Sequence, residues 1–310
     1  MSNNTFNNKL PNLKHLNYLL ALDKYQHFNK AAEACFISQS TLSSAILKLE
    51  QQLSCQLLER DHKRFIFTSH GKRVVALAQK LILHANEFMD FSQQQGCDNS
   101  GSINLGCIPT IAPFLLTDLV QACQKHLPNL ELYLREDTTE NLLLQLEQGE
   151  IDCAILAFPI PNNNFFSIIL GQDDFYIAGD QALVNRYQAS EDYLCLPEKS
   201  IFLLNKEHCL SEHAVAAFKL ADTSLINSFS ASSLATLVQM TAFHHGVTFL
   251  PEMAVNKGVG KLEGLLIEPM QGDVYREIGM IWRKTSMRET TFMSLADVVS
   301  RALLNKKSVS

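Results

Sequence analysis

The hydrophobic positions of the first 68 residues recur at helical spacing and then change to a two-residue alternation. Residues 13–25 predict one helix, and residues 28–50, FNKAAEACFISQSTLSSAILKLE, predict two short helices joined by a tight turn. Ser38 is placed to cap the second of these helices, because its hydroxyl can accept an amide of the first turn. Residues 57–68, LLERDHKRFIFT, alternate as two short strands around a turn would. This order predicts a winged helix-turn-helix, although the helix pair alone is equally typical of an ordinary helical hairpin with a solvated face.

The second helix of the pair has two contrasting faces. Leu42, Ile46, Leu49 and Leu53 form one stripe, which we expect to be buried. The opposite face is polar, and such a face in a helix-turn-helix can enter the major groove of DNA, while cations of the wing contact phosphates. The candidate DNA-binding residues are Asn29, Lys30, Ser38, Gln39, Ser40, Thr41, Ser43, Ser44, Lys48, Arg60, Lys63 and Arg64.

A long amphipathic helix is predicted to follow, from about residue 69 to residue 94, with Thr68 as its cap. The residues that recur in it at intervals of four, three, four and three are Val74, Ala78, Leu81, Ala85 and Phe88. Such a seam on a single helix favours pairing with a second copy, so Val74, Leu81 and Phe88 are the candidate dimerisation residues. The alternative is a helix that packs only within its own domain. The polar stretch 93–102, QQQGCDNSGS, is typical of a linker.

From residue 103 the pattern changes to alternating strands and helices, so residues 103–158 predict a β-α-β-α-β unit with helices on both faces of a parallel sheet. A second α/β unit, with a helix over 209–220, is predicted before a late strand at 275–283. We therefore expect an α+β multi-domain chain that ends in a two-lobed α/β effector domain resembling periplasmic binding proteins, with a small-ligand site in its cleft. The expected domains are the winged helix-turn-helix at 1–68, the linker and dimerisation helix at 69–95, lobe I at 102–162 and 270–305, and lobe II at 163–269.

Composition limits the class of protein further. The 310 residues carry a net charge of −6, but residues 1–73 carry +5 and the remainder −11, which suits a DNA-binding domain fused to an acidic body. The sequence has no run of 18 apolar residues and no apolar signal segment, so we expect a cytoplasmic protein without membrane contact. The eight cysteines include no CxxC pair, so a structural zinc site is not expected. No other metal site and no cofactor is expected either.

Two stretches, FNKAAEACFISQSTLSSAILKLEQQL and LLERDHKRFIFTSHG, resemble the N-terminal domain of LysR-type transcriptional regulators over residues 13–72. Within this family the chain most resembles the OxyR subgroup, whose members sense hydrogen peroxide. The similar segments of the two lobes are GCIPTIAPFLL (106–116), TENLLLQLEQGEIDCAILA (139–157), EHCLSEHA (207–214), SSLATLVQM (232–240) and GVTFLP (246–251). In the DNA-binding domain, the resemblance places Gln39, Thr41 and Ser43 at the groove-facing positions of the recognition helix.

The resemblance also implies a redox site in the effector domain. Cys209 stands at the position of the peroxide-reactive cysteine of the subgroup, and His208 precedes it as in the family. Thr110, Thr139 and Arg276 match residues that lie beside that cysteine. Peroxide reacts with a thiolate, and a helix N-terminus with positive charge nearby favours that form of a cysteine.

The chain departs from the subgroup at this site. Phe218 occupies the position of the second, resolving cysteine, so the usual internal disulfide cannot form. Three outcomes follow for Cys209. It stays a sulfenic acid after oxidation, it is resolved by Cys195, Cys107 or glutathione, or redox sensing has been lost.

These features predict a DNA-binding transcription regulator, not an enzyme, that senses hydrogen peroxide through Cys209 without a cysteine at 218. The alternative is a regulator of the same family whose cleft binds a non-oxidant metabolite. A thiol peroxidase would not need residues 1–94, and a solute-binding protein would need an export signal. The expected partners are a pseudo-palindromic double-stranded operator, a second copy of the chain in a homodimer or a tetramer made of two dimers, and RNA polymerase.

Overall fold

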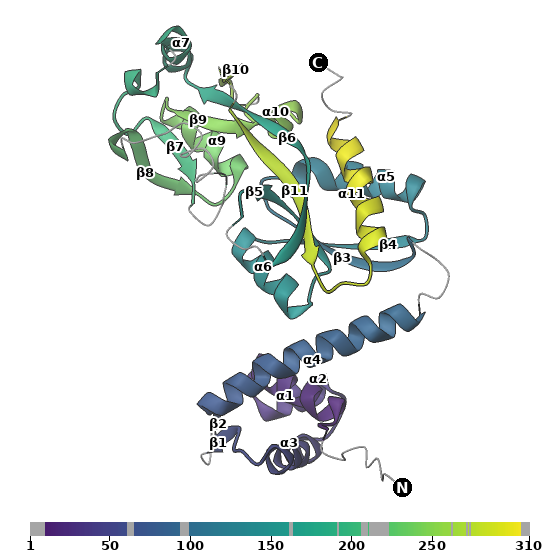
Figure 1. The fold of residues 1–310 in the computed structure, drawn as a ribbon. Coiled ribbons are helices and arrows are strands. Elements are labelled where there is room, and N and C mark those ends of the chain that lie inside the picture. The colour runs from purple at the N-terminus through teal and green to yellow at the C-terminus, as the bar shows by residue number, and fades with distance from the viewer. Residues whose placement is uncertain are drawn as a thin grey trace. The chain divides into compact units, whose positions relative to one another are not determined.

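The chain forms two compact units in a computed structural model, residues 1–95 and 96–310 (Figure 1). The structure describes residues 10–60, 65–93, 99–160, 164–190, 192–205, 210, 223–261, 263–270, 272 and 274–304. At 60, 87 and 90–93 it describes the backbone alone. Within these ranges, none of the helices combines the length and the apolar character that crossing a bilayer requires.

The first unit is a winged helix-turn-helix followed by a long helix, as the sequence predicts. Helices α1 (Leu13–Tyr25), α2 (Phe28–Ala34) and α3 (Gln39–Leu53) surround a core to which the predicted stripe of α3 contributes Leu42, Ile46 and Leu49. Strands β1 (Leu58–Arg60) and β2 (Phe65–Phe67) pair antiparallel as the wing. Helix α4 (Ser69–Gln93) follows the wing and completes the first unit.

The two predicted helix caps are present in this unit. The Oγ atom of Ser38 accepts a hydrogen bond from the amide of Thr41 at 3.1 Å, which begins α3. The Oγ1 atom of Thr68 accepts one from the amide of Gly71 at 2.9 Å, which begins α4. Position 71 needs glycine because a Cβ atom there would lie 2.2 Å from the carbonyl oxygen of Leu57. The start of α4 is thus packed directly against the backbone of the residue that precedes β1.

The second unit begins with the predicted β-α-β-α-β arrangement. Strand β3 (Gly101–Cys107) is parallel to both of its neighbours, β4 (Leu130–Glu136) and β5 (Cys153–Phe158). Helix α5 (Ala112–His126) connects β3 to β4, and α6 (Thr139–Gln148) leads from β4 back past β3 to β5. Because the two connections run in opposite directions along the sheet, right-handed crossovers place the two helices on opposite faces (Figure 1).

Strand β6 (Phe165–Gly179) takes part in both lobes of this unit. Its residues 165–174 pair with β11 (Tyr275–Arg283), which also pairs with β5 of the first lobe. Its residues 175–179 pair with β9 (Val247–Pro251) of the second lobe. The strand order is therefore β4-β3-β5-β11-β6-β9-β7-β8, with β10 (Leu266–Pro269) on β6 beside this path.

The remaining elements complete the two lobes. The second lobe contains α7 (Gln181–Ser190), β7 (Ile201–Leu204), β8 (Ile226–Ala231), α9 (Leu234–Phe243), α10 (Glu252–Asn256) and two short 3-10 helices at Tyr193–Cys195 and Thr223–Leu225. Helix α11 (Glu289–Leu304) returns to the first lobe and packs against α5 (Figure 1). Elements β6, α7, α10 and β10 are not among those that the sequence predicts. The helix predicted at 209–220 lies outside the described residues, apart from Leu210, which is helical.

Candidate functional site

The exposed face of α3 carries most of the predicted DNA-reading residues. The exposed ones are Ser38, Gln39, Ser40, Thr41, Ser44 and Lys48, and Ser43 is half-buried. The hydroxyl oxygen of Ser38 lies 2.9 Å from that of Ser40 and 2.7 Å from that of Thr41. The first turn of α3 therefore presents a cluster of hydroxyl groups whose mutual hydrogen bonds fix their positions.

The other predicted DNA-binding residues come from α2 and the wing. Asn29 and Lys30 are exposed in the first turn of α2. Arg60 is the last residue of β1, where the structure describes the backbone alone. Lys63 and Arg64 lie outside the described residues. The structure thus brings the candidates of α2 and α3 together on one small domain, and the role of the wing cations stays a prediction.

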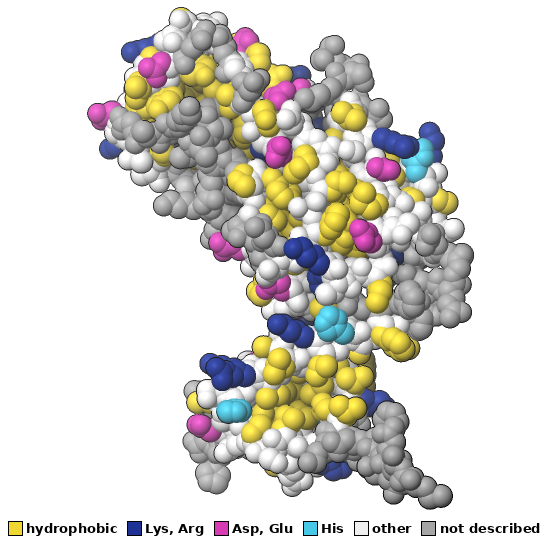
Figure 2. All heavy atoms as spheres, in the orientation of Figure 1, with side chains coloured by type: hydrophobic (Ala, Val, Ile, Leu, Met, Phe, Trp, Pro, Cys, Tyr) yellow, Lys and Arg dark blue, Asp and Glu magenta, His cyan; other side chains and the backbone are white. Residues whose placement is uncertain are grey.

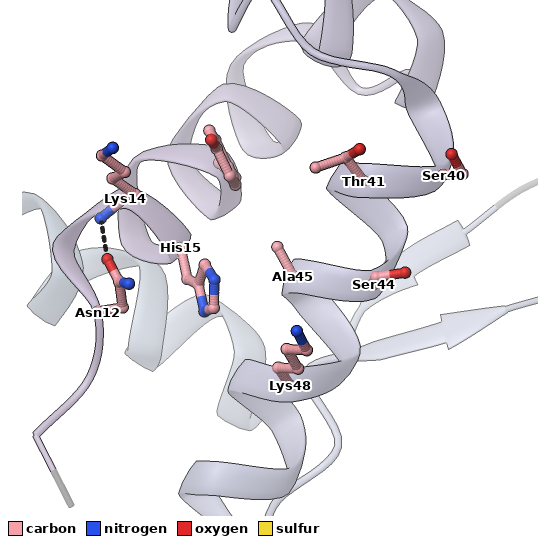
Figure 3. Close-up of a pocket in the computed structure, with 9 residues that line it drawn as sticks. Asn12, Lys14, His15, Ser40, Thr41, Ser44, Ala45 and Lys48 are labelled. Carbon is pink, nitrogen blue, oxygen red and sulfur yellow. Dashed lines mark hydrogen bonds between the residues drawn. The ribbon is translucent and has the colours of Figure 1, made fainter. Parts of the chain in front are cut away.

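A groove of about 380 Å³ between α1 and α3 adds residues that the sequence analysis does not single out (Figure 3). Its lining consists of Asn12, Lys14, His15 and Tyr18 from the start of α1, and Ser40, Thr41, Ser44, Ala45 and Lys48 from α3. The side chains of His15 and Lys48 extend into the space between the two helices (Figure 3). None of these lining residues is acidic. In the sequence, the adjacent basic residues Lys14 and His15 in the first turn of α1 are the signal that could have indicated this groove.

Helix α4 presents hydrophobic side chains to solvent. Val75 and Ala78 are buried in the core of the first unit and Val74 is half-buried. Leu81 and Phe88 retain 49% and 70% of their surface exposed. Figure 2 shows hydrophobic side chains gathered on the face of the first unit that α4 crosses. Two of the three predicted dimerisation residues are therefore uncovered within a single chain.

A buried ion pair lies on the two strands that cross between the lobes. Arg276 of β11 stands opposite Asp173 of β6 in the strand register, and their exposed fractions are 2% and 3%. The Nε and Nη2 atoms of Arg276 donate to the Oδ2 atom of Asp173 at 2.9 and 2.8 Å. Its Nη1 atom donates to the Oγ1 atom of Thr110 at 2.8 Å, and Nη2 to the carbonyl oxygen of Thr110 at 3.0 Å. The predicted pocket residues Thr110 and Arg276 are thus in contact, with Asp173 as a partner that the sequence analysis missed.

Thr139 lies at the same edge of the sheet as Thr110. Strands β3 and β4 end at Cys107 and Glu136, which are register partners, and each threonine follows three residues later. Both threonines therefore lie at the carboxyl edge of the parallel strands, where open α/β sheets bind ligands. Thr139 is 9% exposed, and its Oγ1 atom has no hydrogen-bond partner among the described residues. A buried hydroxyl in this state is available to a small polar ligand.

The described cysteines differ in their ability to form a thiolate. Cys209, with His208 and Phe218, lies outside the described residues. Burial raises the pKa of the Cys107 thiol far above its usual range, and Glu136 adds to the effect. Burial likewise raises the pKa of Cys153, whereas Cys195 is half-buried. The structure therefore weighs against Cys107 as a resolving thiol.

Among the described residues, no three His, Cys, Asp or Glu side chains are grouped so that they could hold a metal ion.

A winged helix-turn-helix followed by a two-lobed α/β unit defines the class of protein, a DNA-binding transcription regulator with an effector domain. The sequence profile described as the LysR substrate binding domain matches residues 98–303. That of the bacterial regulatory helix-turn-helix protein, lysR family, matches residues 13–72. The chain belongs to the LysR family, whose members are transcriptional regulators rather than enzymes, bind DNA and form oligomers.

The relatives of the chain include OxyR proteins. The HTH-type transcriptional regulator EstR of Acinetobacter baylyi is 34% identical over 94% of this chain and 97% of its own length. OxyR of Escherichia coli, a DNA-binding transcriptional dual regulator, is 33% identical over 93% and 94%. A full-length OxyR variant from Pseudomonas aeruginosa has a TM-score of 0.71 at 28% identity, with 94% of this chain and 98% of its own covered. The reduced regulatory domain of OxyR2 from Vibrio vulnificus is 48% identical over 66% and 97%, with a TM-score of 0.61.

Proposed function

We propose that this LysR-family regulator senses hydrogen peroxide through Cys209 and transmits the response to an operator bound by residues 1–68. Several relatives bear the name hydrogen peroxide-inducible genes activator, which supports an oxidant as the effector. The observation that carries the proposal is the buried Thr139 hydroxyl, which has no partner among the described residues and lies on the sheet edge that Thr110 shares. Hydrogen peroxide is small and polar, and it can both accept from and donate to hydroxyl groups of this kind.

Arg276 prepares the hydroxyl of Thr110 for this role. Because the guanidinium group donates to the Oγ1 atom of Thr110, that oxygen acts as an acceptor and keeps its own proton for another partner. The Thr139 hydroxyl supplies a second donor. The two hydroxyls would hydrogen-bond to the peroxide and stabilise the negative charge that develops on the departing oxygen.

The chemical step takes place at Cys209. Its thiolate sulfur attacks one peroxide oxygen, and the S–O bond forms as the O–O bond breaks. The sulfur is oxidised to a sulfenic acid, while the second oxygen is reduced and leaves as hydroxide. With Phe218 at the resolving position, the sulfenic acid persists or reacts with the thiol of Cys195 or of glutathione, which forms a disulfide and releases water. Cys107 and Cys153 are poor competitors because burial disfavours their thiolates.

The DNA-binding part of the proposal places α3 in the major groove. Gln39, Thr41 and Ser44 are exposed on this helix and would meet base edges, while Lys48 and the wing cations would meet phosphates. A dimer formed through α4 would place two recognition helices in successive major grooves of a pseudo-palindrome, and two such dimers would make a tetramer. Contact with RNA polymerase follows if the chain activates transcription, as relatives named activators do.

A second candidate function is a regulator whose effector is a non-oxidant metabolite. Phe218 favours it, because the side chain at the resolving position carries no thiol. The same buried hydroxyls of Thr110 and Thr139 would then hydrogen-bond to a small polar metabolite in the cleft.

Thiol-specific mass spectrometry after a stoichiometric peroxide pulse separates the two candidates. We expect Cys209 to be oxidised fastest of the eight cysteines, because the resemblance places it at the peroxide-reactive position, whereas burial disfavours the thiolates of Cys107 and Cys153. Cys209→Ser should abolish any peroxide-dependent change in the operator footprint, and Phe218→Cys should add an internal disulfide. If another cysteine reacts first, or the wild-type footprint ignores peroxide while Cys209 stays reduced, the redox proposal is wrong and the metabolite candidate takes its place.

A further inference from the structure

The groove between α1 and α3 joins a helix outside the helix-turn-helix to the proposed DNA-reading face of α3. Lys14 is exposed on one wall and Lys48 on the other, so positive charge stands on both sides. His15 and Tyr18 stand on the α1 wall with their ring centroids 6.3 Å apart. The absence of acidic residues from the lining makes the groove suited to an anion.

We propose that this groove seats a backbone phosphate of the operator, held by Lys14, His15 and Tyr18 of α1 together with Lys48 and Thr41 of α3. The inference rests on the proposed binding of DNA through the exposed face of α3. It extends that interface to a helix that the helix-turn-helix pattern does not include.

The chemistry of the lining matches a phosphodiester. Phosphate oxygens only accept hydrogen bonds, and each of these side chains can donate: an ammonium has three N–H bonds, an imidazole at least one, and a phenol or an alcohol one. Such donors account for a large share of protein contacts to DNA phosphates. Each lysine that neutralises a phosphate also releases counterions, so the contact should depend on salt concentration.

The geometry places the groove beside the bases that α3 would read. Four residues both line the groove and belong to the exposed face of α3: Ser40, Thr41, Ser44 and Lys48. If the base edges of a DNA strand contact this exposed face, the sugar-phosphate backbone of that strand would lie beside α1. Between Thr41 and Lys48 the α3 wall carries Ser44 and Ala45. Ala45 is buried, and its small side chain leaves room for the DNA backbone to approach.

The test compares Lys14→Gln and His15→Gln with Lys24→Gln. Lys24 lies in the last turn of the same helix, does not line the groove and serves as the matched control for loss of one charge. We expect Lys14→Gln to weaken binding to operator and to random DNA alike, by roughly fivefold. It should also lower the slope of log affinity against log salt by about one. His15→Gln should weaken both complexes, and Lys14→Arg should restore binding.

Ethylation interference locates the contact on the DNA. One phosphate per half-site should interfere when ethylated in the wild-type complex and cease to interfere with Lys14→Gln. If Lys14→Gln behaves like Lys24→Gln, the groove is not a phosphate seat. Gln39→Ala changes an exposed residue of α3 that does not line the groove, so it separates this failure from failure of the interface as a whole. If it relaxes base preference while Lys14→Gln is silent, only the groove is excluded, and if both are silent the interface on α3 falls with it.

Discussion

At the scale of single residues, Asp173 determines where Arg276 points. Its Oδ2 atom takes two hydrogen bonds from the guanidinium group, and its Oδ1 atom accepts the amide of Met253 at 3.0 Å, in the first turn of α10. The carboxylate therefore links the proposed pocket in the first lobe to a helix of the second lobe. Because both charges are buried, each depends on the other for compensation.

Replacing Asp173 by Asn should leave the buried guanidinium group of Arg276 without a countercharge. We expect the free energy of unfolding to fall by about 3 kcal/mol, measured by urea denaturation. Hydrogen exchange at the Met253 amide should also become faster. Thr248→Val is the control: it removes one buried neutral hydrogen bond, to the carbonyl oxygen of Phe202 at 2.8 Å, and should cost only about 1 kcal/mol. Equal losses in the two variants would contradict a special role for the ion pair.

At the scale of elements, helix α6 is anchored by the residue before its cap. Thr138 makes no side-chain cap bond. Instead the Oδ1 atom of Asp137 accepts from the amide of Thr138 at 2.8 Å and from Asn141 at 2.7 Å, while Oδ2 accepts from Gln145 at 2.9 Å. Burial acts to raise the pKa of Asp137, but these hydrogen bonds outweigh it and hold that pKa below its ordinary value. The start of α6, and with it Thr139, therefore depends on an ionised carboxylate.

The contribution of Asp137 should depend on pH. Because its folded pKa is below its unfolded value of about 3.9, the stabilisation is fully present above that value and is lost as pH falls through the folded pKa. Asp137→Ala should lower the free energy of unfolding by about 1 kcal/mol at neutral pH. Urea titrations at a series of pH values should show this difference closing once the pH falls well below about 4. A difference that stays constant with pH would mean that the charge is not responsible.

The exposed hydrophobic residues Leu81 and Phe88 of α4 are expected to form the dimer interface. Leu81→Glu combined with Phe88→Glu should place unpaired charges in the dimer seam, where burial is costly. Sedimentation should then show smaller species, and operator binding should weaken. Lys80→Glu changes the charge at an adjacent exposed position and should leave the oligomer intact. An unchanged oligomer in the double variant would favour a helix that packs only within its own chain.

Elements of this chain were predictable from sequence to the extent that they are long and periodic. The caps at Ser38 and Thr68 and the parallel strands follow from local pattern. The five-residue α10 and the four-residue β10 are too short to show a period. The fifteen-residue β6 is long, but buried and exposed positions do not alternate regularly along its first half, so the pattern does not reveal it either. The same limit applies to the pairing of Asp173 with Arg276. These residues are 103 positions apart, and only the register of β6 on β11 brings them together.

At the scale of the whole molecule, the continuity of β6 has a consequence for modularity. One strand supplies hydrogen-bonding partners to the sheets of both lobes, so neither lobe can be deleted, duplicated or exchanged in evolution without breaking the other. The first unit stands in a different relation, because residues 1–95 form their own compact body with its own core. Recombination between regulators can therefore exchange the DNA-reading unit as one block, whereas the two effector lobes must be inherited together.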